Sequence, residues 1–370
     1  MNKKYEKSEI NIFRLLWKSI ILFIVINFGF IIFSDVPYGK ITLYNHLFPG
    51  RERLPFGENP DKSFSMTMNN IDAMISSHVI SQSSKKVDEY RVVIIGDSSI
   101  WGFLQPPEST LSGKLEELVN FTCEGKPIEF YNLGYPSLSV LKDLLIIDKI
   151  TEYDPKLIIW LVTLESFPKS TQLDTPLVKN NPILVNNLIQ KYGLEFSEIE
   201  TKPNDFSIIH QRRNLADLFR FQLYGFMWAV TGIDQDYPEE FTPAQRDFSA
   251  DESFKDFNKS ELSSQDLAFD VILNPVKQLD HIDFIIINEP ILISNGKNSH
   301  LRYNFYYPRW AYDQYREIIN KEMADSGIKY FDLWEIIPES EFTNSAIHLS
   351  EIGQKNLAVE ISQIIGRHCQ

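Results

Sequence analysis

The amino-acid sequence predicts an α/β protein: a doubly wound, three-layer parallel sheet with a long insertion, preceded by one transmembrane helix. Three observations predict this class. Short β-branched runs recur along the chain, segments of helical periodicity separate most of them, and an apolar stretch lies near the N-terminus. Of the 370 residues, 43% are hydrophobic and 23% charged, which is typical of a folded protein and not of a disordered one.

The apolar stretch runs from Ile12 to Phe33. At about 1.5 Å per residue in a helix, it is long enough to cross a hydrocarbon core of about 30 Å. Basic residues precede the stretch at Lys3, Lys4 and Lys7 and lie in its first turns at Arg14 and Lys18. The positive-inside rule therefore predicts a cytoplasmic tail at 1–11, an anchor at 12–33 and an extracytoplasmic remainder. A cleaved signal peptide is the rival reading, but the residues around Ser34 offer no small-residue cleavage site.

Residues 34–89 are expected to form a tether and lead-in segment, because they are rich in proline and glycine and contain one helix-like stretch at 66–80. From 90 to 370 the chain is expected to form one α/β domain. The predicted buried strands are Arg91–Gly96, Ile128–Leu133, Leu157–Val162, Phe284–Asn288 and Tyr330–Leu333. The predicted helices are Thr110–Val119, Leu138–Ile150, Ala311–Ala324 and a terminal helix that contains Leu357 and Ile365.

The third and fourth predicted strands are too far apart for one crossover helix, so we expect an insertion at about 166–280. Two placements remain open. The insertion covers the carboxyl ends of the strands, where ligands bind in open α/β sheets, or it adds a layer at the edge of the sheet.

Charge and cysteine content exclude several classes of protein. With 36 Lys and Arg against 50 Asp and Glu, the net charge is −14, which argues against nucleic acid as a partner. The two cysteines, Cys123 and Cys369, are too few for a metal cluster. Two independent thiols are the favoured interpretation, and pairing in an oxidising compartment stays open.

The first predicted strand ends in Gly96-Asp97-Ser98-Ser99. A serine at this turn is exposed at the carboxyl edge of the sheet, and Gly96 permits the tight turn. Nearby backbone amides are suited to an oxyanion. The tripeptide alone is a weak signal, because such turns are common.

A histidine lies at the other end of the domain. His348 follows the last predicted strand and directly precedes the terminal helix. A histidine at that place is suited to act as general base for Ser98.

The two ends of the domain together resemble the SGNH (GDSL-like) hydrolase family, over about residues 90–366 without the insertion. Its members are α/β proteins, and the resemblance implies a flavodoxin-like sheet. The family's nucleophile falls on Ser98 and its general base on His348. Its oxyanion donors fall on the backbone amides of Ser98 and of Gly134, in the segment Asn132-Leu133-Gly134-Tyr135-Pro136-Ser137. Judged by itself, Gly134 is equally well an ordinary turn glycine.

The chain departs from the family at two blocks. Thr163-Leu164-Glu165-Ser166 stands where the family has Gly-x-Asn-Asp, so the side-chain amide donor of the oxyanion hole is absent and a carboxylate replaces it. Ser345 stands where the family has the acid, three residues before the base. Glu165, Glu289 and Asn344 are the alternatives for orienting His348, and the two glutamates fall at the carboxyl edge of the sheet. A plain Ser98–His348 dyad is a further alternative.

An aromatic-rich stretch follows the fourth predicted strand, and Tyr307, Arg309 and Trp310 within it are candidate sugar-binding residues. Simple coverage of the sheet edge is the competing interpretation. Because the sequence contains no phosphate-binding glycine loop and no metal-ligand pattern, no cofactor and no metal is expected.

The anchor and the resemblance together imply an extracytoplasmic ester hydrolase or O-acyl (acetyl) transferase that acts on a cell-envelope glycan or lipid ester through a serine acyl-enzyme. They also imply a membrane O-acyltransferase as partner. The altered blocks support a second hypothesis, a catalytically degraded SGNH fold that serves as a binding or assembly module for such an acyltransferase. A carboxylate in contact with a Ser98–His348 pair opposes the second hypothesis, and a blocked Ser98 favours it.

Overall fold

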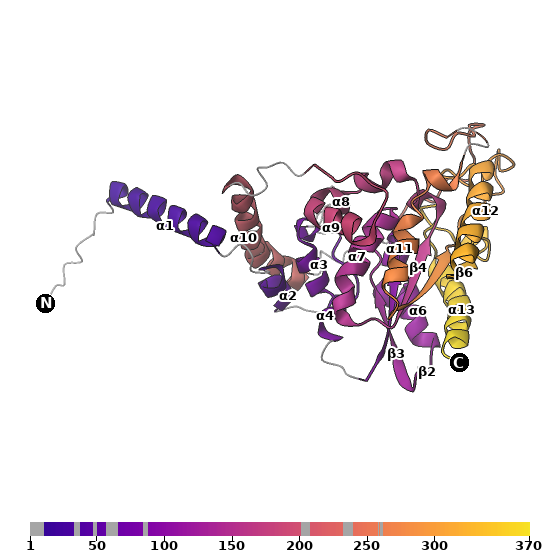
Figure 1. The fold of residues 1–370 in the computed structure, drawn as a ribbon, viewed down its shortest axis with the longest axis horizontal. Coiled ribbons are helices and arrows are strands. Elements are labelled where there is room, and N and C mark those ends of the chain that lie inside the picture. The colour runs from indigo at the N-terminus through magenta and orange to yellow at the C-terminus, as the bar shows by residue number, and fades with distance from the viewer. Residues whose placement is uncertain are drawn as a thin grey trace.

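The computed structural model describes residues 11–32, 38–46, 50–56, 66–83, 88–200, 208–231, 240–257, 259 and 262–370. Its centre is a six-stranded sheet (Figure 1). The strands are β1 Tyr90–Ile95, β2 Thr122–Cys123, β3 Lys126–Asn132, β4 Leu157–Val162, β5 Asp283–Asn288 and β6 Lys329–Asp332. Five strands are parallel in the order β3-β1-β4-β5-β6, and the short β2 pairs with β3 in the antiparallel sense.

This order confirms the predicted fold class. It is the doubly wound, flavodoxin-like order, in which the chain reverses direction next to its first strand. All five predicted strands are present. The sequence interpretation missed β2, because a two-residue strand carries no periodic signal.

Thirteen α-helices accompany the strands in the described part of the chain. Those before β4 are α1 Ile12–Ile32, α2 Leu43–His46, α3 Ile71–Ser77, α4 Ile80–Ser83, α5 Ser98–Trp101, α6 Leu111–Leu118 and α7 Val140–Ile150. Those after it are α8 Pro176–Asn180, α9 Pro182–Tyr192, α10 Ile208–Thr231, α11 Asp270–Gln278, α12 Arg309–Ser326 and α13 Glu351–His368.

The central strands are apolar along their whole length because both faces of the sheet are covered. In β1, Val93 and Ile95 enter the core formed with α7, α11 and α12, whereas Val92 and Ile94 enter the core formed with α6 and α13. The same alternation continues through β4 and β5. A parallel sheet that is buried on two sides therefore shows continuous hydrophobic runs instead of a polar face.

The insertion combines the two placements that the sequence left open, an added layer and a cover over the carboxyl ends of the strands. The side chains of α8, α9 and α11 join the core on the α7 side of the sheet, for example Leu177, Leu188 and Ile272. Another part of the insertion lies at the carboxyl edge, where the Ala244 amide donates to the Thr343 carbonyl at 2.8 Å. The insertion is thus partly an added layer and partly a cover over the edge where ligands bind in this class of fold.

The described part of the expected tether packs on the domain. Leu54, Ile71, Met74 and Ile75 are buried in the core next to α7. The segment predicted as a helix at 66–80 is a 3₁₀ turn followed by α3, which ends at Ser77. The side chain of Asn70 caps α3 by accepting from the Ala73 amide.

The two cysteines are paired, so the expectation of independent thiols was wrong. Cys123 lies on β2 and Cys369 directly follows α13, and their sulfur atoms form a disulfide. The hairpin of β2 and β3 lies at the edge of the sheet, and α13 packs against α6 on the same side. The fold therefore brings two cysteines together that are 246 residues apart in the sequence.

Helix α1 projects away from the α/β domain (Figure 1). The span Ile12–Phe30 has a mean hydropathy of 1.8, and none of it is buried. Its length and composition fit a membrane-crossing helix and fit a signal sequence equally well. Phe33, the last residue of the predicted anchor, lies outside the described residues.

Candidate active site

Ser98 lies at the carboxyl edge of the sheet, where β1 turns into the short helix α5. Asp97 caps this helix, since its carboxylate accepts from the Ser99 amide at 2.7 Å. A side chain at Gly96 would lie 2.6 Å from Ile100 Cγ1, so the close packing of α5 on this turn favours glycine. The local sequence thus makes Ser98 the first residue of α5, with an amide that has no acceptor inside the helix.

His348 and Asn344 extend from Ser98 in a line of hydrogen bonds. Ser98 Oγ and His348 Nε2 are 2.7 Å apart, and His348 Nδ1 lies 2.7 Å from Asn344 Oδ1. Because an amide oxygen only accepts, Nδ1 carries the proton and Nε2 presents its lone pair to the serine hydroxyl. The ring of Phe103 stacks on His348, with centroids 5.2 Å apart. This arrangement is the one needed for a serine whose proton passes to a neighbouring base.

Loop closure brings Asn344 to His348. The Thr343 amide donates to the His348 carbonyl at 2.9 Å, and Phe342 and Leu349 form an antiparallel bridge. The loop therefore returns on itself, and Asn344 faces a residue four positions later. Ser345, the residue at the family's acid position, instead lies near the phenol of Tyr306.

Burial governs the protonation of His348. The side chain is 8% exposed, and loss of solvent lowers the pKa of the imidazole to about 4. Burial is the only cause of this shift. His348 is therefore neutral near pH 7 and able to accept a proton, and no carboxylate in the described part of the chain forms an ion pair with it.

Neither glutamate proposed from the sequence contacts His348, so the suggestion that Glu165 or Glu289 orients the imidazole was wrong. Glu289 accepts a hydrogen bond from Ser99 Oγ at 2.5 Å. Glu165 forms an ion pair with Lys255 of the insertion at 2.9 Å. Both lie at the carboxyl edge as expected, but their partners come from other loops. Of the three alternatives, Asn344 is the one that lies against the imidazole.

A buried pair of carboxyl groups lies behind the nucleophile. Burial raises the pKa of Asp97, and burial with the Asp97 charge raises that of Glu289 well above its usual value. The two carboxyl groups hydrogen-bond to each other. One proton is therefore shared between them, with Glu289 the protonated member. Through Ser99, the pair holds the first turn of α5.

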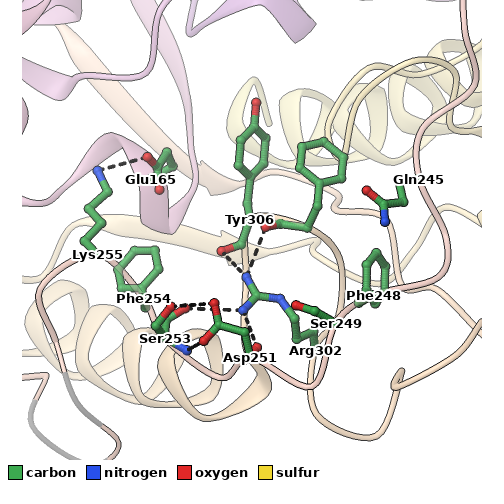
Figure 2. Close-up of a pocket in the computed structure, with 11 residues that line it drawn as sticks. Glu165, Gln245, Phe248, Ser249, Asp251, Ser253, Phe254, Lys255, Arg302 and Tyr306 are labelled. Carbon is green, nitrogen blue, oxygen red and sulfur yellow. Dashed lines mark hydrogen bonds and ion pairs between the residues drawn. The ribbon is translucent and has the colours of Figure 1, made fainter.

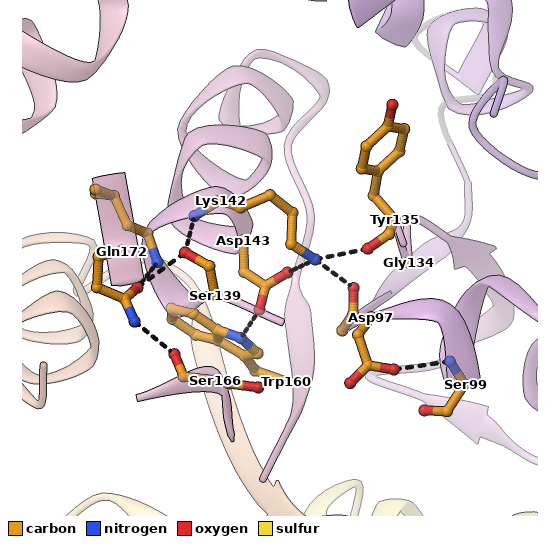
Figure 3. Close-up of polar contacts among 12 residues, drawn as sticks. Asp97, Ser99, Gly134, Tyr135, Ser139, Lys142, Asp143, Trp160, Ser166 and Gln172 are labelled. Atoms are coloured by element: carbon orange, nitrogen blue, oxygen red, sulfur yellow. Dashed lines mark hydrogen bonds and ion pairs between the residues drawn. The ribbon is translucent and has the colours of Figure 1, made fainter. Parts of the chain in front are cut away.

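A second buried network ties this edge of the sheet to α7 (Figure 3). Lys142 is fully buried, and its ammonium donates to the carbonyls of Gly96 and Tyr135, both at 2.8 Å. It also pairs with Asp143 at 2.5 Å, which in turn accepts from the indole of Trp160 at 3.0 Å. Burial raises the pKa of Asp143 to about 6. One lysine thus fixes the loop before Ser98 and the loop after β3.

The segment after β4 is held in a similar way. Gln172 accepts from Ser139 Oγ at 2.9 Å and donates to the Ser166 carbonyl at 2.8 Å (Figure 3). The sequence interpretation missed Asp97, Lys142 and Gln172 as supports of the site. Polar residues inside an apolar helix were the available signal, as at Lys142 and Asp143 in α7.

Gly134 lies next to α5, and its amide is already engaged. Its N–H donates to Asn132 Oδ1 at 3.1 Å, and the Asn132 amide donates to the Ile100 carbonyl at 2.7 Å. A side chain at Gly134 would lie 2.5 Å from the Trp101 nitrogen. Close packing against α5 therefore requires this glycine. An oxyanion would have to displace Asn132 to receive a bond from its amide.

A pocket of about 420 Å³ lies at the end of the segment after β4, and neither Ser98 nor His348 is among the residues that line it (Figure 2). It is lined by Glu165, Gln245, Phe248, Ser249, Asp251, Ser253, Phe254, Lys255, Arg302, Phe305 and Tyr306. Glu165 and Lys255 face each other across one end, and Arg302 donates to the carbonyls of Phe305 and Tyr306. The phenol of Tyr306 lies near Ser345 of the His348 loop.

The aromatic residues proposed to bind a sugar lie elsewhere. Tyr307 is fully buried and its hydroxyl lies 3.1 Å from Thr163 Oγ1. Arg309 donates to the Ser299 carbonyl at 2.6 Å, and the Trp310 indole donates to the Glu252 carbonyl at 2.7 Å. All three pack against protein, so the structural interpretation of this stretch holds for them. The neighbouring Phe305 and Tyr306 line the pocket instead.

Metal ligands were also sought among the residues that the structure describes. No group of three or more His, Cys, Asp or Glu side chains there is placed to hold a metal ion.

Comparison with known proteins gives structural matches at low identity. No family model matches the chain. No curated protein matches it either. The carbohydrate acetylesterase Est24 of Sinorhizobium meliloti is similar, with 11% identity, a TM-score of 0.34, and coverage of 75% of this chain and 98% of that one. An aryl esterase of M. smegmatis (12%, TM-score 0.34) and a lipolytic G-D-S-L family protein of Veillonella parvula (11%, TM-score 0.33) match over the same shares, 75% and 98%.

The chain's own geometry decides the type of fold. Its flavodoxin-like strand order, with Ser98 after the first strand and His348 before the last helix, matches the arrangement that the resemblance implies. The α/β domain is therefore SGNH hydrolase-like in fold.

Proposed function

We propose that this chain is a serine ester hydrolase or O-acyl transferase, with Ser98 as nucleophile and His348 as general base. The observation that supports this proposal best is a chain of two hydrogen bonds. Ser98 Oγ lies 2.7 Å from His348 Nε2, and His348 Nδ1 lies 2.7 Å from Asn344 Oδ1. A serine, a neutral buried imidazole in the correct tautomer and a pocket at the same edge of the sheet are the parts that acyl transfer needs.

The reaction follows from these positions. Ser98 Oγ attacks the ester carbonyl carbon as its proton moves to His348 Nε2, and a tetrahedral oxyanion forms next to the Ser98 amide. His348 then returns the proton to the leaving alcohol, the C–O bond breaks and an acyl-enzyme remains. Water or a glycan hydroxyl then gives its proton to His348 and attacks the acyl carbonyl carbon. The bond from that carbon to Ser98 Oγ breaks, and His348 returns the proton to Oγ, which restores both residues. Asn344 keeps the imidazole oriented throughout but adds no charge.

The proposed location is the extracytoplasmic side of a membrane, with α1 as an uncleaved anchor. Basic residues concentrated before the apolar span support a cytoplasmic N-terminus. The disulfide between Cys123 and Cys369 supports an oxidising compartment for the α/β domain. These two observations are independent of each other and agree on the side of the membrane.

The proposed substrate is an acyl ester on a cell-envelope glycan or lipid, handled together with a membrane O-acyltransferase. The pocket at this edge of the sheet supports a sugar, because it combines polar groups such as Gln245 and Asp251 with the aromatic walls of Phe248 and Phe305. Lys255 offsets the negative charge that Glu165 brings to this edge.

Labelling with a serine-reactive fluorophosphonate tests the enzyme proposal. The full chain in detergent is expected to be labelled at Ser98, and Ser98→Ala and His348→Ala are expected to lose the label. His281→Ala removes an exposed histidine far from the serine and serves as the matched control. An unlabelled but folded wild-type protein would refute the proposal.

A binding or assembly module is the second candidate, and two observations favour it. The Gly134 amide is engaged by Asn132, and Glu165 stands where an amide donor is expected. Under this reading the oxyanion hole is incomplete, and the domain serves a membrane acyltransferase as a scaffold. Copurification of an acyltransferase with a chain that resists labelling would support it, whereas turnover of an aryl acetate that depends on Ser98 would refute it.

A further inference from the structure

Glu289 is a buried acid to which the proposed reaction assigns no role. It directly follows β5 and is 2% exposed. Its Oε2 accepts a hydrogen bond from Ser99 Oγ at 2.5 Å, and its carboxyl group also contacts that of Asp97. Asp97 and Ser99 are the two chain neighbours of Ser98. Glu289 therefore holds both residues that flank the proposed nucleophile.

These contacts require a proton on Glu289. Ser99 engages Oε2, and Oε1 is buried and receives no hydrogen bond from any residue that the structure describes. A carboxylate can only accept a hydrogen bond, whereas a carboxylic acid has one O–H to donate. A proton on Oε1 gives this atom a partner, because it donates to the carboxylate of Asp97. Without the proton, two negative charges would be buried side by side.

The surroundings of the two carboxyl groups keep the proton on Glu289. Burial raises the pKa of Asp97, but the Ser99 amide, 2.7 Å away, and the nearby ammonium of Lys142 oppose this rise (Figure 3). Burial raises the pKa of Glu289 as well, and the negative charge of Asp97 raises it further. Asp97 is therefore the carboxylate of the pair, and Glu289 is the neutral acid.

Two further titratable groups lie close to the pair. Asp143 on α7 forms an ion pair with Lys142 at 2.5 Å, and its remaining effect is to raise the pKa of Glu289. The Tyr306 phenol lies within reach of the Asp97 charge, and burial raises its pKa above the usual value of 10. Neither group therefore takes the proton from Glu289 near pH 7.

The backbone at Ser98 depends on this pair of carboxyl groups. Ser98 is the first residue of α5, a helix of only four residues, and Asp97 is its N-cap. The amide of Ser99 is held by Asp97 and its hydroxyl by Glu289. If the shared proton is lost, the two carboxylates repel each other and the turn between them shifts. A shift of about 1 Å at a reacting group can lower a rate about 10²-fold.

We propose that Glu289 is a positioning residue for Ser98 and acts as a neutral carboxylic acid that bridges Asp97 and Ser99. The bridge keeps Ser98 Oγ aligned with His348 while the proton is present, and it opens when the proton is lost at alkaline pH. The proposal rests on the proposed function, because this alignment matters only if Ser98 is the nucleophile. Glu289 itself contacts neither His348 nor the substrate.

Two substitutions of Glu289 separate its shape from its proton. Glu289→Gln has the same shape, and its amide oxygen accepts from Ser99 while its N–H donates to Asp97, but it does not titrate. Glu289→Ala removes both contacts. Glu360→Gln is the matched control, because it makes the same change at an exposed position of α13. The full chain in detergent is labelled with the fluorophosphonate from pH 6 to pH 10, and circular dichroism confirms folding at each pH.

We expect the labelling rates of the wild type and the control to fall several-fold at the alkaline end of this range. Glu289→Ala is expected to be labelled at least about tenfold more slowly at pH 7. Glu289→Gln is expected to recover most of that loss and to show no alkaline fall.

Three results would overturn the proposal and leave Ser98 as the nucleophile. Glu289→Gln as slow as Glu289→Ala would show that the site needs an ionised carboxylate. The same alkaline fall in Glu289→Gln and the wild type would show that the proton of Glu289 is not responsible. A wild-type rate in Glu289→Ala would show that this residue does not position Ser98.

Urea unfolding gives a second measurement that needs no reactive serine. Folded wild-type protein keeps the Glu289 proton at pH values where the unfolded chain has lost it, so its stability decreases as the pH rises. We therefore expect Glu289→Gln to gain stability relative to the wild type from pH 5 to pH 8, and a difference that does not change with pH overturns the proposal. An unlabelled wild type whose stability difference does change with pH refutes the proposed function, and the positioning role with it, but confirms the protonated bridge.

Discussion

At the scale of single residues, the site is a serine and a histidine whose third member is an amide. Asn344 fixes the tautomer of His348, as the distance of 2.7 Å to Nδ1 requires, but it cannot neutralise an imidazolium. Burial without a carboxylate partner lowers the pKa of His348 to about 4. The base is therefore well oriented and weak, and both properties are measurable.

The lowered pKa predicts an unusual pH profile. Protonation removes the lone pair that receives the Ser98 proton, so labelling is lost as the pH falls through the pKa of His348 in the folded protein. We expect the rate of fluorophosphonate labelling to fall around pH 4, and not around the value of 6.5 of an ordinary histidine. The rate is measured only at pH values where circular dichroism shows that the protein is folded. A labelling rate that already falls near pH 6.5, the acid limb of the profile, would contradict the prediction.

Replacing Asn344 tests the missing charge. Asn344→Asp places a carboxylate beside Nδ1, which stabilises the imidazolium and raises the pKa of His348. We expect the acid limb to move to higher pH and the plateau rate to rise by about tenfold or more. Asn344→Leu has similar volume and no acceptor, and is expected to reduce labelling. Equal rates for all three proteins would show that Asn344 does not orient the base.

At the scale of elements, the site depends on contacts between loops that the sheet brings together. Lys142 on α7 holds the carbonyls of Gly96 and Tyr135, which belong to the loops after β1 and β3. Its partner Asp143 is equally buried. The first turn of α7 therefore supports the position of Ser98 without touching it.

Removal of the lysine charge is predicted to destabilise the domain. Lys142→Met leaves Asp143 without its counter-ion, and we expect a loss of about 3–5 kcal/mol in the free energy of unfolding. The raised pKa of Asp143 means that the folded state retains its proton to higher pH, so the loss increases as the pH rises through about 6. Urea unfolding at pH 5 and pH 8 measures both effects.

A double variant separates the charge from the packing. Lys142→Met with Asp143→Asn removes both charges and keeps an acceptor for the Trp160 indole. We expect it to be more stable than Lys142→Met alone at pH 8. The single variant Asp143→Asn completes the comparison. If the losses in the free energy of unfolding of the two single variants add up to that of the double variant, the ion pair makes no specific contribution to stability.

At the scale of the whole molecule, the disulfide connects the edge of the sheet to the C-terminal helix. Cys123 and Cys369 enclose the part of the α/β domain from β2 to the end of α13, and their sequence separation is 246 residues. A cross-link over such a long loop restricts the unfolded chain strongly. The same bond supports the extracytoplasmic placement of the domain.

Loss of this bond is predicted to cost about 2–5 kcal/mol of stability. The variant Cys123→Ser with Cys369→Ser is compared with the wild type by urea unfolding, with and without reductant. Reductant is expected to destabilise the wild type and leave the double variant unchanged. Equal stability of all four samples would show that the bond does not restrict the unfolded chain.

The sequence by itself determined the features that depend on short segments. Continuous β-branched runs predicted the five parallel strands, because a strand buried on both faces has no polar side. Ser98 after the first strand and His348 before the last helix were likewise identified from their local positions, since the ends of parallel strands meet at one edge. The apolar span from Ile12 to Phe33 was predicted in the same way, because its length and apolar composition set its capacity to cross a bilayer.

Only the tertiary structure decided which partners these residues have. Asn344 reaches His348 because its loop closes through the Thr343 amide, and Glu165 meets Lys255 because the insertion folds over the edge of the sheet. The pairing of Cys123 with Cys369 depends on the position of a two-residue strand that no periodicity reveals. These contacts join segments distant in the sequence or depend on loop closure, and local propensity contains no record of either.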